Sequence, residues 1–158
     1  MQTVIERELT AYEMERGKPM PSKNHSKLEK RLVIALSVNY QEKYEILPEL
    51  SLELPTGRAV PDVAICEITP SDWLEDEIRV TQVPFGVIEI MSPSQSDQEM
   101  VDKLDIYFEA GVKSCWIVIP TFQTIHVFSS KRQYRTFTRE KLTDDRLGIE
   151  LDLIELFR

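Results

Sequence analysis

The chain has 158 residues, of which 42% are hydrophobic and 29% charged, with only 5 glycines. This composition predicts a single domain over 1–158 with a substantial core, and it excludes an intrinsically disordered protein. The net charge of −8 excludes the capture of nucleic acid by bulk electrostatic attraction. A polyanionic substrate would therefore need local lysines and arginines, a metal ion or a groove between two copies of the chain.

The cysteines and the apolar runs indicate the cellular compartment of the protein. Cys66 and Cys115 lie in apolar, strand-like runs without the spacing of a zinc site, so we expect buried free thiols in a reducing compartment. No apolar run approaches the roughly 18 residues of a membrane span. The charged N-terminal segment lacks the apolar centre of a signal peptide. We therefore expect a cytoplasmic protein with no membrane partner.

An amphipathic helix is predicted over about residues 25–42, after a cap at Ser22 or Asn24. Its apolar side chains recur at helical spacing and should face the core: Leu28, Leu32, Leu36 and Tyr40.

A second helix begins after Ser96, because Ser96 and Glu99 have the S-x-x-E spacing of a capping box. Gly111 is typical of the residue that ends such a helix. The helix carries a second apolar stripe: Met100, Leu104, Tyr107 and Phe108.

Short apolar or alternating runs predict the strands. They lie at residues 49–54, 60–66, 85–91, 115–119, 124–129 and 133–138. The last two should pair as a hairpin, and the chain ends in a short strand or a turn of helix. The strand–helix–strand unit over 85–119 implies two parallel strands joined by a right-handed crossover. The predicted fold class is therefore α/β, with a mixed β-sheet flanked by helices.

Two carboxylates stand in unusual places. Glu89 interrupts an otherwise apolar strand, where an unpaired charge would be costly, and Asp62 follows Pro61 at the start of another strand. If these strands pair, both carboxylates can meet at one end of the sheet. Such a small set of oxygen ligands suits Mg²⁺, which would neutralise Glu89 and activate water for attack on a phosphate.

A hydrolase of this kind usually has a lysine beside its metal. The simplest position, two residues after Glu89, holds Met91. Lys103 is the replacement that we expect, because Met100 and Tyr107 flank it at helical spacing and bring its stem to the buried face. Taken one by one, each residue is more often a turn residue, a solvated strand residue or a solvated lysine, so the inference rests on the set.

The residues resemble the PD…(D/E)-x-K pattern of the restriction-endonuclease-like nucleases, and the chain is similar to one branch, the Uma2 family. The matching segments cover most of the sequence. They are "YEMERGKPMPSKNHSKL" (12–28), "AVPDVAIC" (59–66), "VIEIMSPSQSDQEMVDKLDIYFEAGVKSCWIVIP" (87–120) and "IHVF" (125–128).

The resemblance implies a restriction-endonuclease-like core and a metal site. Asp62 and Glu89 match the metal-binding acids, with the backbone carbonyl of Ile90 as a further ligand, and Lys103 matches the catalytic lysine. The implied cofactor is Mg²⁺, for which Mn²⁺ can substitute. Three further positions are secondary candidates, for which local packing is the simpler interpretation: Glu13, His25 and Glu29.

Two functions follow from this resemblance. The first is a Mg²⁺-dependent endonuclease that hydrolyses phosphodiester bonds, with DNA as the favoured substrate and a homodimer as the expected assembly. The alternative is a non-catalytic nucleic-acid-binding or regulatory protein on a nuclease fold, in keeping with the acidic charge. Three cations of the predicted hairpin are candidate phosphate contacts, although a solvated hairpin tip is the simpler interpretation: Lys131, Arg132 and Arg135. His126 is expected to be structural.

Overall fold

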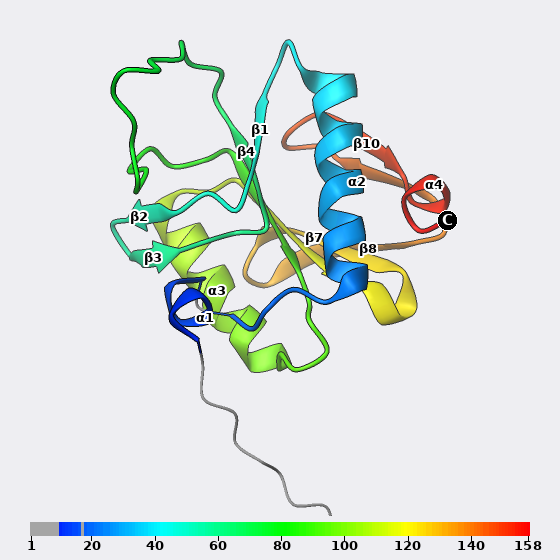
Figure 1. The fold of residues 1–158 in the computed structure, drawn as a ribbon. Helices are drawn as coiled ribbons and strands as arrows, with labels where there is room; N and C mark the ends of the chain where they lie inside the picture. Colours follow the sequence, from blue (N-terminus) through cyan, green and yellow to red (C-terminus); the bar gives the residue numbers. More distant parts are fainter. Residues whose placement is uncertain (1–9, 17) are drawn as a thin grey trace, which may run out of the picture.

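The computed structural model describes residues 10–16 and 18–158. Its centre is a six-stranded sheet in the order β1-β4-β5-β6-β7-β8 (Figure 1). The strands are β1 (Glu45–Pro48), β4 (Val63–Cys66), β5 (Gly86–Ile90), β6 (Ser114–Ile119), β7 (Thr124–Ser130) and β8 (Gln133–Thr138). Strands β5 and β6 run parallel, while the other neighbours run antiparallel. The predicted mixed sheet, its parallel crossover and its hairpin are confirmed.

Two short ladders and the helices complete the fold. The ladders pair β2 (Leu52–Leu54) with β3 (Gly57–Ala59), and β9 (Lys141–Asp144) with β10 (Ile149–Asp152). The helices are α1 (Ala11–Arg16), α2 (Lys23–Tyr40), α3 (Asp97–Ala110) and α4 (Leu153–Leu156), with a 3₁₀ turn, η1, at Pro120–Phe122.

The helix ends follow from capping chemistry. The Ser22 hydroxyl accepts a hydrogen bond from the backbone amide of His25, so Ser22 rather than Asn24 caps α2. Ser96 caps α3 in the same way. Gly111 follows α3 with φ of 102°, a left-handed conformation that glycine adopts without strain.

The prediction of one strand over 49–54 is wrong. Strand β1 ends at Pro48, and β2 begins only at Leu52. Glu49 between them has φ of 51°, which turns the chain out of the sheet. A second expectation also needs correction, because Cys115 is buried but Cys66 is only half-buried, although both are free thiols.

Two apolar clusters hold the helices against opposite faces of the sheet. Leu28, Leu32 and Leu36 of α2 pack in the cluster that contains Ile88 and Ile90 of β5. The other cluster joins Val87 to three buried residues of α3: Met100, Leu104 and Tyr107. Because side chains alternate along a strand, Glu89 lies on the same face as Val87, beneath α3. Among the described residues, no helix is long and apolar enough to cross a membrane.

Candidate active site

The pairing of β4 with β5 brings Asp62 and Glu89 to the same end of the sheet. Val63 lies opposite Ile88 in this ladder, so Asp62, which precedes Val63, lies near Glu89. The backbone amide of Ile90 donates a hydrogen bond of 2.6 Å to Asp62 Oδ2, which also puts the backbone of Ile90 beside the acid pair. Both carboxylates are buried. Such groups need partners, because an unpaired charge in a protein interior is costly.

Lys18 lies between the two carboxylates. Its Nζ is 2.6 Å from Asp62 Oδ1 and 3.2 Å from Glu89 Oε2, and its side chain is 0% exposed. Lys18 was not predicted as a site residue. Its partners are 44 and 71 positions away along the chain, so no local pattern marks Lys18. The one available signal was its place within the segment 12–28 that resembles the family.

Helix α3 supplies the other partners of Glu89. Lys103 Nζ is 3.3 Å from Glu89 Oε2, and its side chain remains 17% exposed. The Tyr107 hydroxyl donates a hydrogen bond of 2.5 Å to Glu89 Oε1. Burial, reinforced by the charge of Glu89, raises the pKa of Tyr107 well above its ordinary value, so the phenol stays protonated and remains a donor.

The role of the Tyr107 hydroxyl was missed because the residue was assigned only to the apolar stripe of its helix. The ring does pack in the core beneath α3. However, Lys103 and Tyr107 are four residues apart, a spacing that brings two side chains to the same face of a helix. That spacing was a usable signal once Lys103 had been proposed.

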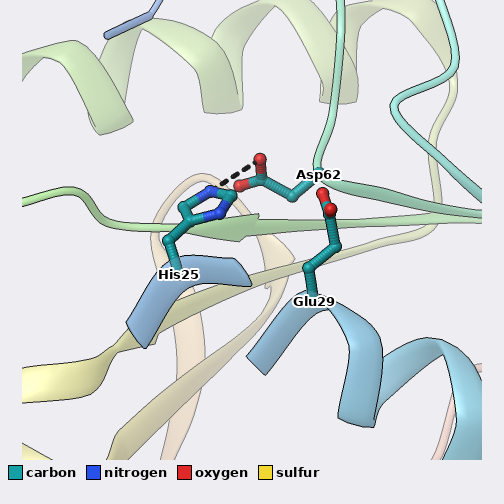
Figure 2. A group of neighbouring side chains, drawn as sticks. All are labelled: His25, Glu29 and Asp62. Atoms are coloured by element: carbon teal, nitrogen blue, oxygen red, sulfur yellow. Dashed lines mark ion pairs between the residues drawn. The ribbon is translucent and has the colours of Figure 1, made fainter. Parts of the chain in front are cut away.

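The first turns of α2 direct His25 and Glu29 toward Asp62 (Figure 2). His25 Nε2 is 2.9 Å from Asp62 Oδ1, and both side chains are fully buried. One ligand atom from each of His25, Glu29 and Asp62 lies within 4.8 Å of the others. These three side chains therefore form a second potential metal-binding group that shares Asp62 with the acid pair.

The electrostatics of this cluster divide its carboxyl groups into two kinds. Burial alone would raise the pKa of Asp62, but the hydrogen bond from His25 and the charge of Lys18 outweigh it and lower that pKa to about 2. Burial, with the neighbouring carboxyl group of Glu49, raises the pKa of Glu29 to about 8. Asp62 is thus a carboxylate near neutral pH, while Glu29 largely keeps its proton.

Glu13 is buried in the segment that precedes the cluster. Its Oε2 accepts a hydrogen bond of 3.3 Å from the Met20 amide, and its Oε1 accepts one of 3.2 Å from the Thr10 hydroxyl. Its backbone carbonyl accepts a hydrogen bond from the amide of Lys18. These contacts give Glu13 a positioning role, because they hold the chain that carries Lys18.

The hairpin cations lie apart from the acids, along β7 and β8 and the turn between them. Lys131 pairs with Asp105 of α3 at 2.7 Å. The guanidinium of Arg135 lies over the ring of Phe137, 5.0 Å from its centroid, and Arg132 is exposed on the turn. His126 Nδ1 is 2.8 Å from the Thr136 hydroxyl, a cross-strand contact within the hairpin.

Comparison with known proteins identifies the family. The sequence model of Uma2, described as "Putative restriction endonuclease", matches residues 5–154. The chain belongs to the Uma2 family. The resemblance noted in the sequence is thus confirmed, and membership of this family supports a nuclease function. No curated protein matches the sequence significantly.

A solved structure has a similar fold. It is described as a putative nuclease belonging to DUF820 from Anabaena variabilis ATCC 29413, and it superposes with a TM-score of 0.75. The alignment covers 88% of this chain and 83% of the other, at 22% sequence identity. At that identity the likeness establishes the shared fold of the Uma2 chain, a mixed sheet flanked by helices.

Proposed function

We propose that this Uma2 chain is a Mg²⁺-dependent endonuclease that hydrolyses phosphodiester bonds of nucleic acid, with DNA as its substrate. One observation carries the proposal. Two buried carboxylates, Asp62 and Glu89, converge on a single cation, the ammonium of Lys18. Oxygen atoms that already gather around one positive charge are suited to a hard divalent cation, which prefers carboxylate ligands.

The donor set fits such a metal. Asp62 and Glu89 would hold Mg²⁺, with the Ile90 carbonyl as a further ligand, and Mn²⁺ could replace it because carboxylate and carbonyl oxygens suit both ions. When bound, the metal supplies Lewis acidity that stabilises charge on the phosphate and acidifies water.

The surrounding side chains fix the orientation of the acids. The Tyr107 hydroxyl holds Glu89 Oε1, and the Ile90 amide holds Asp62 Oδ2. Each carboxylate therefore keeps one oxygen bound to a protein donor, while the other oxygen faces Lys18. Preorganised groups of this kind lose little freedom during a reaction, which is a large part of their catalytic value.

Lys103 is the residue that we expect to contact the phosphate. Its ammonium is anchored to Glu89 at 3.3 Å, yet part of the side chain reaches solvent. A cation in that position can stabilise the negative charge that builds on the phosphate oxygens and can orient the attacking water. The partly exposed side chain lets substrate approach it without rearrangement of the core.

The proposal includes a cytoplasmic homodimer. Two copies of the site could act on the two strands of a duplex, and a pair of free thiols is in keeping with a reducing compartment.

The alternative is a non-catalytic nucleic-acid-binding or regulatory protein on the same fold. The observation that favours it is again Lys18, because its ammonium already pairs with both acids without a metal. The two functions differ in whether a divalent cation binds there.

Calorimetric titration of Mg²⁺ and Mn²⁺ into wild type, Asp62→Ala and Glu89→Ala separates these functions, with plasmid nicking measured on the same samples. We expect wild type to bind metal and nick, and both variants to lose both properties. Glu150→Ala is the matched control, because this carboxylate forms an exposed ion pair with Lys141. A wild-type protein that binds no metal at millimolar concentration would exclude the nuclease and favour the alternative.

A further inference from the structure

A groove of about 630 Å³ opens between α3 and the β7–β8 hairpin, outside the acid cluster. Met100 and Leu104 form its wall on α3, and Ile117 lies on its floor. The hairpin contributes three rings: His126, Phe128 and Tyr134. Most of the lining is therefore apolar or aromatic, in a chain whose surface is strongly acidic.

The three rings form one connected aromatic surface. The centroids of Phe128 and Tyr134 are 4.7 Å apart, and those of His126 and Tyr134 are 5.4 Å apart. Tyr134 is 56% exposed, although it lies against two other rings. Burial lowers the pKa of His126, so its ring is neutral at neutral pH and offers a π-face rather than a charge. A flat ligand with its own π-face can stack on such a surface.

Positive charge borders the same groove. Lys131 and Arg132, on the turn of the hairpin, contribute to its lining, together with the acid Asp97. Lys131 is held against Asp105 of α3. Within the part of the chain that the structure describes, no ion pair engages Arg132, whose side chain is exposed. Aromatic faces beside cations suit a ligand that combines an aromatic ring with a phosphate.

The register of the sheet connects the groove with the acids. Glu89 of β5 lies opposite Ile117 of β6, and Ile117 lies opposite His126 of β7. These three residues therefore form one row on a single face, and His126 is two strand spacings, or about 10 Å, from Glu89. That distance corresponds to about three nucleotides at the ~3.4 Å rise of one stacked strand. Met91, two residues after Glu89 and just beyond the end of β5, also lines the groove.

From these observations we infer that the groove binds an unpaired nucleobase of the nucleic-acid strand whose scissile phosphate lies at Lys103, beside the acid pair. The base stacks on Tyr134 and its neighbouring rings, while Arg132 contacts the adjoining phosphate. This inference rests on the proposed nuclease function and adds to it a preference for single-stranded or locally opened substrate. Stacking and cationic contacts of this kind bind strands with little dependence on sequence.

The test compares Tyr134→Ala, Tyr134→Phe and wild type for binding to fluorescein-labelled single-stranded DNA and RNA, with Ca²⁺ in place of Mg²⁺. We expect Tyr134→Ala to weaken binding by about 5- to 150-fold, the range for losing one base–aromatic stack, and Tyr134→Phe to bind as wild type does. Phe122→Ala is the control, because Phe122 is 73% exposed on η1 outside the groove and its loss should leave affinity unchanged. A 2-aminopurine placed in the strand should also lose fluorescence on binding to wild type and not to Tyr134→Ala.

Several outcomes would overturn the inference. One is equal affinity of Tyr134→Ala and wild type for both strands, and another is the absence of any binding by wild type. A third is a change in oligomeric state of Tyr134→Ala with unchanged strand affinity, which would assign the groove to a contact between two copies of the chain. Metal binding is measured separately on each variant. If strand binding does not depend on Tyr134 while metal binding and nicking are intact, only the base-binding groove is excluded. If metal binding and nicking are absent, the nuclease proposal itself fails.

Discussion

The acid pair is held from two sides that differ in burial. On the α2 side, Lys18 and His25 contact Asp62, and neither side chain is exposed. On the α3 side, Lys103 and Tyr107 contact Glu89, and Lys103 is partly open to solvent. The two lysines thus share one carboxylate, Glu89, yet only one of them has a path to a ligand in solution.

The difference in exposure between Lys18 and Lys103 suggests that the two ammonium groups have different roles. A buried ammonium between two carboxylates stabilises their convergence in the folded chain, because like charges would otherwise repel each other. A partly exposed ammonium beside the same acids can also meet the phosphate of a substrate. We therefore expect Lys103 to govern catalysis, and Lys18 to govern stability and the entry of a metal.

The largest effect should come from Lys103→Met, which keeps the apolar stem and removes the charge. We expect nicking of plasmid to fall by about 10²–10³-fold, the usual cost of losing one group that stabilises transition-state charge. Calorimetric metal affinity should change less than after loss of Lys18, because Lys103 contacts only Glu89, whereas Lys18 contacts both acids. Lys141→Met is the control, since Lys141 forms only an exposed ion pair.

Retained nicking in Lys103→Met would break the proposed division of tasks. If Lys18→Met had lost its nicking in the same assay while still binding metal, the catalytic charge would have to come from the α2 side instead.

Lys18→Met should act on stability and metal binding. Without the ammonium, two buried carboxylates lose a shared partner, and we expect the metal-free protein to lose about 2 kcal/mol of stability. Metal should bind more tightly than to wild type, because it no longer displaces a resident cation. Thermal melts with and without Mn²⁺ measure both effects, and the metal-induced rise in Tm should exceed that of wild type.

The matched control for Lys18→Met is again Lys141→Met, which should change neither quantity. An equal or smaller metal-induced rise in Tm for Lys18→Met would mean that metal and ammonium do not compete for the same oxygens.

The sequence was sufficient for the parts of the fold that have strong local signals. Helix α3 has a capping serine, an apolar stripe and a terminal glycine, and all three are confirmed. Strands β3 and β9 were missed, because strands of three or four residues carry too little periodicity to be recognised. The predicted strand over 49–54 begins at Glu49, whose left-handed backbone separates β1 from β2, so only residues 52–54 of that alternating pattern form a strand.

The candidate site likewise contains residues that local sequence signals predicted and one that they did not. Asp62, Glu89 and Lys103 were proposed from their places on strand and helix, and the structure brings them together. Lys18 was missed because the contact depends on tertiary folding, with partners more than 40 positions away in sequence. An ammonium in the interior is also contrary to the usual exposure of lysine, so residue type gave no indication either.

The smallest expected effect concerns Glu29, on the α2 side, and appears as a pH dependence of stability. Its pKa is raised to about 8 in the folded chain, from an ordinary value of 4.5. The folded state therefore holds this proton more tightly than the unfolded state. Its stabilising contribution is complete below pH 4.5, falls as pH rises, and is lost above about 8. Because the side chain is only half-buried, solvent screening should limit the effect to about 1 kcal/mol or less.

Glu29→Gln isolates this contribution, because the amide is neutral at every pH and keeps the shape of the side chain. Thermal melts of the metal-free protein between pH 5 and 9 should show a shallower loss of Tm for the variant than for wild type. Asp62 cannot produce such a slope, since its pKa is lowered to about 2 and its contribution is lost only as pH falls from 3.8 toward that value. Glu53→Gln, which changes an exposed acid, should follow wild type. Parallel curves for Glu29→Gln and wild type would show that the α2 side titrates no proton in this range, and the slope would then have to come from another group.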